Sequence, residues 1–394
     1  MSSIRDWIEA NAPQSLRGTA STPFQGYWGG RSSFPNDDVR LWFERCLAEG
    51  RTAPAWPVEY GGAGMSVDEH REWRSELQRL RMPLPLVGIG LTMIGPILLE
   101  EGSEEQKAQH LPPIARGDLR WCQGYSEPEA GSDLASLACS AVREGDELVV
   151  NGQKIWTSHA EVSDWIFCLV RTDTREKHAG ISFLLIDMKT PGITTRTIEL
   201  ISGASPFCEV FFDDVRVPVS NVVGELNQGW AVAKALLRHE RGMVGESIAA
   251  GGARLEILRR YNLRDDALSR LGTDSEGRLA DPLVRDRIVR LEMDQEAMRL
   301  TVKRSNDRVK AGARPGPESS ILKIVGTELN QARWELAVEL AGAEGLGWEG
   351  PGYDDVDLGL ARQWLRSRGN SIEGGTNEIQ RNIVARRVLG LPKS

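Results

Sequence analysis

The segment from Ser126 to Asp133 combines side chains and backbone that could bind a polar ligand. Its sequence, SEPEAGSD, places hydroxyl groups at Ser126 and Ser132 beside the turn-forming residues Pro128 and Gly131. Such residues favour tight turns, which leave backbone N–H groups able to donate to a ligand. The alternative is an ordinary surface turn, because most clusters of this kind only connect two elements.

A second candidate lies at the end of a predicted strand, where residues 151–159 read NGQKIWTSH. The indole of Trp156 offers a flat apolar wall for an aromatic ligand, and the hydroxyl of Ser158 could stabilise negative charge that develops on it. A single strand tryptophan is usually a core residue, so Trp156 alone does not identify a site.

Glu240 is a candidate general base. It lies three and four residues from Leu237 and Leu236 on one side, and from Met243 and Val244 on the other. This spacing places the carboxylate on the apolar stripe of an amphipathic helix. Burial disfavours the charged form of a carboxylate and so makes it a stronger base. The alternatives are a buried structural ion pair and a solvated helix face.

Length and composition allow a large framework to position these residues. The chain has 394 residues, of which 40% are hydrophobic and 26% are charged, as in ordinary globular proteins. A chain of this length suits about two or three domains. The net charge of -8 at pH 7 has the wrong sign for a protein that binds phosphate backbones, so nucleic acid is not an expected partner.

The cysteines and histidines predict neither a disulfide framework nor a metal site. The five cysteines are widely spaced and contain no CxxC, and the five histidines show no metal-binding spacing such as HExxH. The first residues, MSSIRDWIEA, include acids and lack the basic and apolar stretches of a secretory signal. Reduced thiols and a cytoplasmic location are therefore expected.

Periodicity divides the chain into an N-terminal helical domain (1–118), a middle β domain (119–222) and a C-terminal helical bundle domain (223–394). No GxGxxG follows a strand, which disfavours a nicotinamide-binding domain. In the middle domain, short β-rich runs separated by turn residues predict a compact antiparallel β-barrel or sandwich. These runs are Glu147–Ser158, Asp164–Thr172, Gly180–Asp187, Gly192–Leu200 and Cys208–Pro218.

Long amphipathic helices are predicted after residue 223, as in a four-helix bundle. Asp281 followed by Pro282 predicts an N-cap and the first helical position. The uncharged run Met82–Leu99 contains several prolines and glycines, so a short buried helix is expected there and not a membrane span. The predicted C-terminal helices are Gln228–Tyr261, Asp281–Lys310, Glu318–Ala341 and one after Thr376.

The domain order and several motifs resemble the acyl-CoA dehydrogenase family over essentially the whole chain. The resemblance implies a mainly α fold with a central β domain, and FAD as the cofactor. The motifs are WPVEYGGAG at 56–64, WCQGYSEPEAGSDLASL at 121–137, NGQKIWTSH at 151–159, ELAGAEG at 339–345 and IEGGTNEIQR at 372–381.

The resemblance also implies which residues bind FAD. Trp156 matches the tryptophan that lies against the flavin ring. Gln123 and Tyr125 depart from the commonest residue types at their positions, as do Glu339 and Ala343 in a loop that a neighbouring subunit's flavin reaches. The family's Arg-x-x-Phe-Gly adenine contact is not recognisable around 262–285. The implied cofactor residues are Gln123, Tyr125, Ser126, Gly131, Trp156, Thr157, Ser158, Glu339, Gly342, Ala343, Thr376, Asn377 and Glu378.

Sequence register separates two candidates for the base. Many relatives carry it in a YEGT sequence, but counting back from Thr376 places Gly374 at that position and Glu373 one residue earlier. Isovaleryl- and long-chain-type relatives carry the acid on an earlier helix just before an arginine, which Glu240 and Arg241 match.

Glu240 is therefore the expected base, and Glu373 is the reserve candidate or a residue that shapes acyl selectivity. The backbone N–H of Gly374, with a flavin ribityl hydroxyl, is expected to stabilise the thioester oxygen. Ser132 and Arg241 are expected to lie on the substrate.

The implied reaction is the FAD-dependent α,β-dehydrogenation of an acyl-CoA to the trans-2-enoyl-CoA, with electrons passed to an electron-transfer flavoprotein. A homotetramer or heterotetramer is implied. The alternatives are an acyl-CoA oxidase or elimination enzyme on the same fold, and a non-catalytic partner subunit of a heterotetrameric dehydrogenase. The unrecognised adenine motif motivates the last of these.

Overall fold

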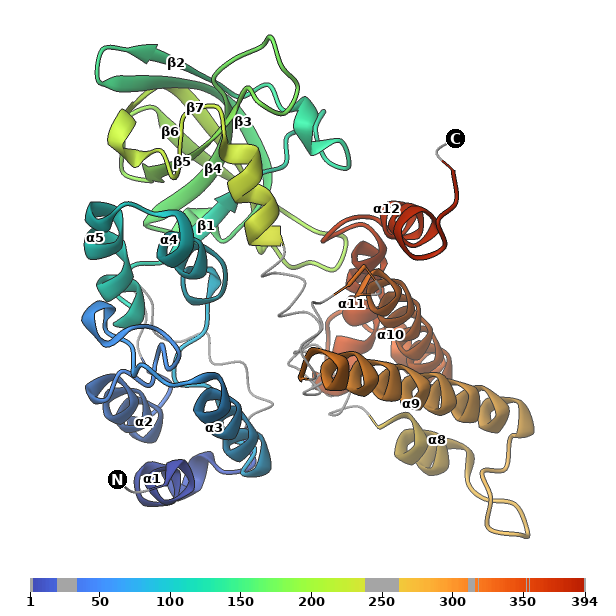
Figure 1. Ribbon diagram of the computed structural model, residues 1–394. Helices are drawn as coiled ribbons and strands as arrows, with labels where there is room; N and C mark the ends of the chain where they lie inside the picture. The colour runs from blue at the N-terminus through green and yellow to red at the C-terminus, as the bar shows by residue number, and fades with distance from the viewer. Residues whose placement is uncertain are drawn as a thin grey trace. The chain divides into compact units, whose positions relative to one another are not determined.

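The computed structural model describes residues 3–19, 34–237, 262–310, 316–317, 319–351, 353 and 355–392. The chain forms two compact units, one of Met1–Ile198 with Ser205–Glu240 and one of Glu199–Ala204 with Arg241–Ser394. The first unit holds the N-terminal helices and the β-sheet, and the second holds the C-terminal helices (Figure 1).

Serine caps begin three of the N-terminal helices. The hydroxyls of Ser3, Ser66 and Ser103 accept the N–H three residues later, and the side chain at that position returns a hydrogen bond to the capping residue. This reciprocal arrangement satisfies two backbone donors at each helix start. The helices are α1 (Ile4–Asn11), α2 (Asp37–Ala48), α3 (Val67–Arg79), α4 (Gly95–Glu101) and α5 (Glu104–Ala115).

The uncharged run at 82–99 contains a short buried helix, as predicted. One π-helical turn, Gly90–Ile94, leads into α4, and Ile94, Ile97 and Leu98 are fully buried. Gly95 is needed at this point, because a Cβ there would lie 2.1 Å from the ring of Trp56. Within the described ranges, no helix is long and apolar enough to cross a membrane.

The middle of the chain forms a seven-stranded sheet in which β5 pairs with β4 and the other strands follow the order β1-β4-β2-β3-β7-β6. Pairing is antiparallel except between β1 and β4 and at one β2–β4 contact. The five predicted runs correspond to β3 to β7, whereas β1 and β2 are too short for a clear period-two pattern. The strands are β1 (Trp121–Gly124), β2 (Ser140–Glu144), β3 (Glu147–Ser158), β4 (Trp165–Arg171), β5 (Ile181–Asp187), β6 (Ile193–Ile198) and β7 (Phe207–Pro218).

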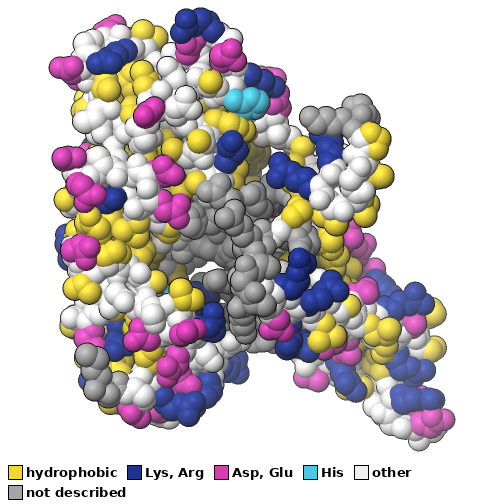
Figure 2. Space-filling view, viewed as in Figure 1, with side chains coloured by type: hydrophobic (Ala, Val, Ile, Leu, Met, Phe, Trp, Pro, Cys, Tyr) yellow, Lys and Arg dark blue, Asp and Glu magenta, His cyan; other side chains and the backbone are white. Residues whose placement is uncertain are grey.

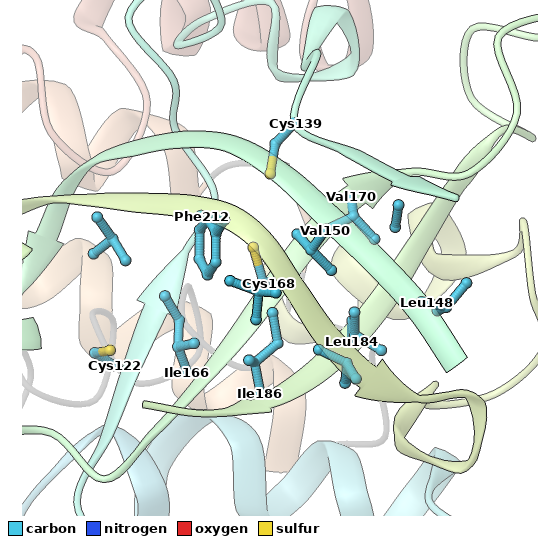
Figure 3. Packing of buried hydrophobic residues seen from close by; sticks show 14 of the residues in the cluster. Cys122, Cys139, Leu148, Val150, Ile166, Cys168, Val170, Leu184, Ile186 and Phe212 are labelled. Atoms are coloured by element: carbon cyan, nitrogen blue, oxygen red, sulfur yellow. The ribbon is translucent and has the colours of Figure 1, made fainter. Parts of the chain in front are cut away.

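Aliphatic side chains and thiols form the core of this sheet (Figure 3). Cys122, Cys139 and Cys168 lie among Val150 and Ile186, and all are nearly inaccessible. Burial raises the pKa of the Cys122 thiol to about 12. Burial likewise raises the pKa of the Cys168 thiol, so Cys122 and Cys168 stay protonated and pack as small apolar side chains.

His110 of α5 is buried against two indoles. It is 1% exposed and lies edge-on to Trp121 and Trp165, with ring centroids 5.1 and 4.6 Å away. Its Nδ1 has no hydrogen-bond partner among the described residues. Desolvation by burial lowers the pKa of His110 to about 4.

The free energy of unfolding is expected to fall on acidification because of His110. The unfolded chain binds the proton near pH 6.5 and the folded chain only near pH 4, so stability is complete above pH 6.5 and is lost between these values. The expected loss from pH 7 to pH 5 is about 2 kcal/mol, at 1.36 kcal/mol per unit. Urea unfolding at both pH values measures it. His110→Phe should remove this part of the pH dependence. The control His178→Gln, at an exposed histidine, should leave it unchanged. Equal pH dependence in all three proteins would show that His110 is not its cause.

The second unit is helical. Oδ1 of Asp281 accepts the N–H of Leu283 at 2.8 Å and of Val284 at 3.0 Å, which confirms the predicted N-cap. The helix described at residues 229–237 belongs to the first unit, and 238–261 of the predicted helix Gln228–Tyr261 lie outside the described residues. Two helices, α8 and α11, are additional to those predicted. The helices of the second unit are α8 (Leu263–Leu271), α9 (Pro282–Lys310), α10 (Ser319–Ala341), α11 (Asp355–Arg368) and α12 (Asn377–Ile383).

Charged side chains of both signs are interspersed on the face shown in Figure 2. Along α9, Arg290 pairs with Asp286 and Lys303 pairs with Asp307, each four residues apart and exposed. Exposed pairs of this kind each contribute little to stability. Removing one of them is therefore a control for the loss of stability expected when a buried pair is broken.

Candidate functional site

A buried ion pair holds the loop that follows β1. Lys154 of β3 is 0% exposed, and its Nζ donates to Oε1 of Glu127 at 2.6 Å and to the carbonyl of Tyr125 at 3.3 Å. The carboxylate of Glu127 also accepts the N–H groups of Ala138 at 2.6 Å and Cys139 at 3.0 Å. This one carboxylate therefore joins both ends of the loop to β3.

The same loop presents the predicted ligand-binding residues. The carbonyl of Ser126 accepts the N–H of Ile155 at 2.9 Å, which places Ser126 beside the strand that carries Trp156. Gly131 and Ser132 are exposed at the tip of the loop. A rigidly attached base with an open tip suits a loop that contacts a ligand.

A bulge in β3 turns Trp156 outward. Strict alternation would place Trp156 on the inward face with Lys154, but the register with β7 shifts between Lys154 and Thr157. Trp156 has a left-handed φ of 61° and is 52% exposed, while Thr157 is fully buried. The ring of Phe207 lies edge-on to the indole, 6.1 Å away. Left-handed backbone is unusual for a bulky residue and clusters at functional sites.

Two of the predicted cofactor residues have side chains in the core. Tyr125 is 6% exposed and lies edge-on to Phe167 and Phe183. The buried hydroxyl of Thr157 has no hydrogen-bond partner among the described residues. A cofactor lying on Trp156 would meet these two residues through their backbone. Gln123 and Ser158 are half-buried, and their contacts to a cofactor stay predictions.

Arg171 ties the same loop to a neighbouring turn. Its guanidinium donates to the carbonyls of Ala135 at 2.7 Å and Leu137 at 3.3 Å on the loop, and to those of Glu176 at 3.2 Å and Lys177 at 2.9 Å on the turn after β4. Four backbone acceptors for one side chain make Arg171 a structural residue that keeps the two loops together.

The second unit carries the C-terminal glycine motif. Gly374 and Gly375 both have left-handed φ angles, 64° and 88°, which glycine adopts without steric cost. The hydroxyl of Thr376 accepts the N–H of Ile379 at 3.2 Å and begins α12. The buried side chain of Asn377 accepts a hydrogen bond from Lys323 at 2.8 Å. Thr376 and Asn377 therefore have structural contacts that fix this turn.

Glu378 lies exposed on the first turn of α12. Hydrogen bonds from its own backbone N–H and from the Thr376 hydroxyl lower the pKa of this carboxyl. Glu378 is therefore anionic at neutral pH, and a cofactor phosphate would be repelled from its side chain. Its predicted contact with the dinucleotide is therefore expected to involve the backbone of Glu378 or a hydroxyl group of the dinucleotide.

The third motif ends α10. Glu339 pairs with Arg287 of α9, and Gly342 ends the helix with a left-handed φ of 56°. Ala343 follows with an ordinary helical φ of -62°. The ion pair with Arg287 compensates the charge that Glu339 introduces in place of the glutamine that the resemblance implies.

The predicted base lies outside the described residues, as does its neighbour. Glu240 and Arg241 fall within residues 238–261. Glu373 is described, and its carboxylate accepts hydrogen bonds from Arg366 at 2.7 Å and from Asn370 at 2.6 Å.

Sequence reasoning missed Lys154 and Glu127, which position the loop. The available signal was a lysine at an inward position of a β-rich run. Among the described residues, no group of three or more His, Cys, Asp or Glu side chains could hold a metal ion.

The protruding indole and the anchored loop fit a flat aromatic cofactor with polar edges. Trp156 supplies an apolar face held in strained backbone, and the neighbouring loop supplies hydroxyls at Ser126 and Ser132. The fit concerns the first unit alone, since Gly374 and Thr376 belong to the second unit.

Family models match nearly the whole chain. The N-terminal, middle and C-terminal domains of acyl-CoA dehydrogenases match residues 19–118, 122–215 and 227–389. The acyl-CoA dehydrogenase IpdE1 of Mycobacterium tuberculosis is 37% identical, over 99% of this chain and 96% of the relative.

Two solved structures are similar over 99% of this chain and 96% of theirs. The Tcur3481-Tcur3483 steroid ACAD has 32% sequence identity and a TM-score of 0.75. The ChsE4-ChsE5 complex from Mycobacterium tuberculosis has 31% identity and a TM-score of 0.73. Both names contain two components.

Proposed function

Because this chain belongs to the acyl-CoA dehydrogenase family, whose members are FAD-dependent oxidoreductases, we propose that it converts an acyl-CoA thioester to the trans-2-enoyl-CoA. Electrons then pass to an electron-transfer flavoprotein. The observation that best supports the proposal is Trp156, whose indole protrudes from a strained bulge beside the anchored 126–138 loop. FAD, when bound, would supply the acceptor for the hydride that leaves the β-carbon.

The residues of this chain divide the remaining work. Glu240 removes the proton from the α-carbon, and the backbone N–H of Gly374 donates to the thioester oxygen, where negative charge develops as the proton leaves. Trp156 provides an apolar wall that excludes water from one face of the flavin ring. Ser132 and Arg241 orient the thioester.

The bound ring has further contacts in the proposed site. The residues that would hold the flavin, in part through their backbone, are Gln123, Tyr125, Ser126, Gly131, Thr157 and Ser158. Thr376, Asn377 and Glu378 would contact the remainder of the dinucleotide, and Glu339, Gly342 and Ala343 would contact the dinucleotide of a neighbouring subunit. The family resemblance suggests a tetramer, homomeric or of two related chains, in which this last contact would form.

Anaerobic titration with acyl-CoA thioesters tests the proposal. The purified holoenzyme should lose its flavin absorbance when substrate is added and regain it when an acceptor is supplied. The name "steroid ACAD" belongs to a structure 32% identical to this chain, so a steroid-bearing acyl-CoA should be compared with straight-chain thioesters. Absence of bleaching with every thioester would overturn the dehydrogenase assignment.

A second candidate function is that of a partner subunit that completes a site in another chain. The two-component names of the similar structures favour testing it. In that case the chain purified alone would be colourless and would bind FAD only with a second chain.

A further inference from the structure

Glu373 joins two elements of the second unit through its carboxylate. Nη2 of Arg366, on α11, donates to Oε2 at 2.7 Å, and Nδ2 of Asn370 donates to Oε1 at 2.6 Å. The side chains of Arg366 and Glu373 are 26% and 27% exposed. Charge-assisted hydrogen bonds of this kind are short and directional, so the carboxylate is held in one orientation.

Asn370 is itself fixed to α10. Its Oδ1 accepts a hydrogen bond from Nδ2 of Asn330 at 2.7 Å, and its carbonyl accepts one from the hydroxyl of Thr327 at 3.4 Å. Nearby, Gln331 donates to the carbonyl of Ser367 at 3.1 Å. Glu373 is therefore the end of a polar chain that begins on a 23-residue helix.

The glycine pair follows directly and is held from its other side. Nε2 of Gln380 donates to the carbonyl of Gly374 at 3.3 Å, and the N–H of Glu373 donates to the carbonyl of Gly369 at 3.0 Å. Among the described residues, none accepts a hydrogen bond from the N–H of Gly374. Two consecutive glycines lose much conformational freedom on becoming ordered. The hydrogen bonds on both sides of the turn help to offset this cost.

We propose that Glu373 is a positioning residue and not the base: its carboxylate, clasped by Arg366 and Asn370, fixes the peptide whose N–H at Gly374 donates to the thioester oxygen. The inference rests on the proposed function. Each carboxylate oxygen is held by a hydrogen bond, from Arg366 and from Asn370, so turning the carboxylate toward a substrate proton would break these contacts. An oxyanion donor is effective only when its position is set before the reaction.

Glutamine and alanine substitutions separate the two roles. Glu373→Gln keeps the shape and one strong acceptor, so its kcat should fall less than about tenfold, whereas loss of a general base would cost ~10²–10⁴-fold. Glu373→Ala removes both contacts and should lower kcat by about ten- to a hundredfold with little change in KM, since the donor acts on developing charge. Arg366→Ala should match it, and the double variant should lose no more than either alone.

Hydrogen exchange of the holoenzyme tests, without turnover, whether the contacts of Glu373 with Arg366 and Asn370 hold the glycine turn in place. Amides of residues 369–376 should exchange faster in Glu373→Ala and Arg366→Ala than in the natural protein. Glu328→Ala is the matched control, because Glu328 forms an exposed pair with Arg381 in the same unit and should change neither exchange nor kcat. Each variant is first checked for bound FAD.

The outcomes distinguish the inference from the function on which it rests. Loss of bleaching in Glu373→Gln beyond a hundredfold, with unchanged exchange, would make Glu373 the base and overturn the inference. If none of the thioesters bleaches the flavin of the natural protein, the proposed function fails, and hydrogen exchange alone tests the role of Glu373. Faster exchange in the variants then supports the positioning role, and unchanged exchange refutes it.

Discussion

Replacing Lys154 by methionine is expected to lower the free energy of unfolding of the first unit by ~3–5 kcal/mol. Lys154 is 0% exposed, and Glu127, its partner at 2.6 Å, is 8% exposed. Removing the cation leaves a carboxylate buried in the base of the 126–138 loop without its counter-charge. Chemical denaturation followed by tryptophan fluorescence measures the loss, and FAD retention reports on the loop.

A double-mutant cycle identifies the cause of that loss. Glu127→Gln combined with Lys154→Met should cost less than the sum of the two single changes, because the uncompensated charge is gone. Lys303→Met removes an exposed partner of Asp307 and should cost about 0–1 kcal/mol. A Lys154→Met protein as stable as the Lys303→Met control would show that the buried pair does not hold the loop.

The elements that sequence predicted well are those with a repeating pattern. Strands β4 and β5 are continuously apolar runs, and Asp281 with Pro282 marks the start of α9 by local chemistry alone. The short strands β1 and β2 give no such pattern. The pairing of β1 with β4 comes from contacts distant in sequence, as the Trp121–Trp165 register shows, whereas β2 forms a local hairpin with β3.

The candidate site depends on features that no local pattern contains. Alternation alone would put Lys154 and Trp156 on one face, and only the bulge buries the lysine while exposing the indole. Likewise, Glu127 and Lys154 are 27 residues apart, so neither residue predicts its partner.

The C-terminal motif shows the same limit. Sequence register predicts that Gly374 stands at the catalytic position, but the contacts of Glu373 with Arg366 and Asn370 depend on α11, which periodicity did not predict. A motif therefore locates the turn, while the packing of neighbouring helices determines which side chains in it are already bound to other groups.

Glu240→Gln is expected to slow flavin bleaching ~10²–10⁴-fold while FAD stays bound, because a general base contributes about that factor. Glutamine preserves size and polarity but cannot take up the α-proton. Stopped-flow mixing with a saturating acyl-CoA under anaerobic conditions measures the rate, and the visible flavin spectrum confirms retention of the cofactor.

Comparison with Glu373→Gln makes this result specific to the base. Both substitutions remove one negative charge from the C-terminal part of the chain, so a general electrostatic effect on the cofactor would slow both variants alike. A base at Glu240 predicts a large loss in one and a loss below about tenfold in the other. A near-normal bleaching rate in Glu240→Gln would contradict the register argument. If the bleaching rate of Glu373→Gln were at the same time strongly reduced, Glu373 in the glycine turn would be the base.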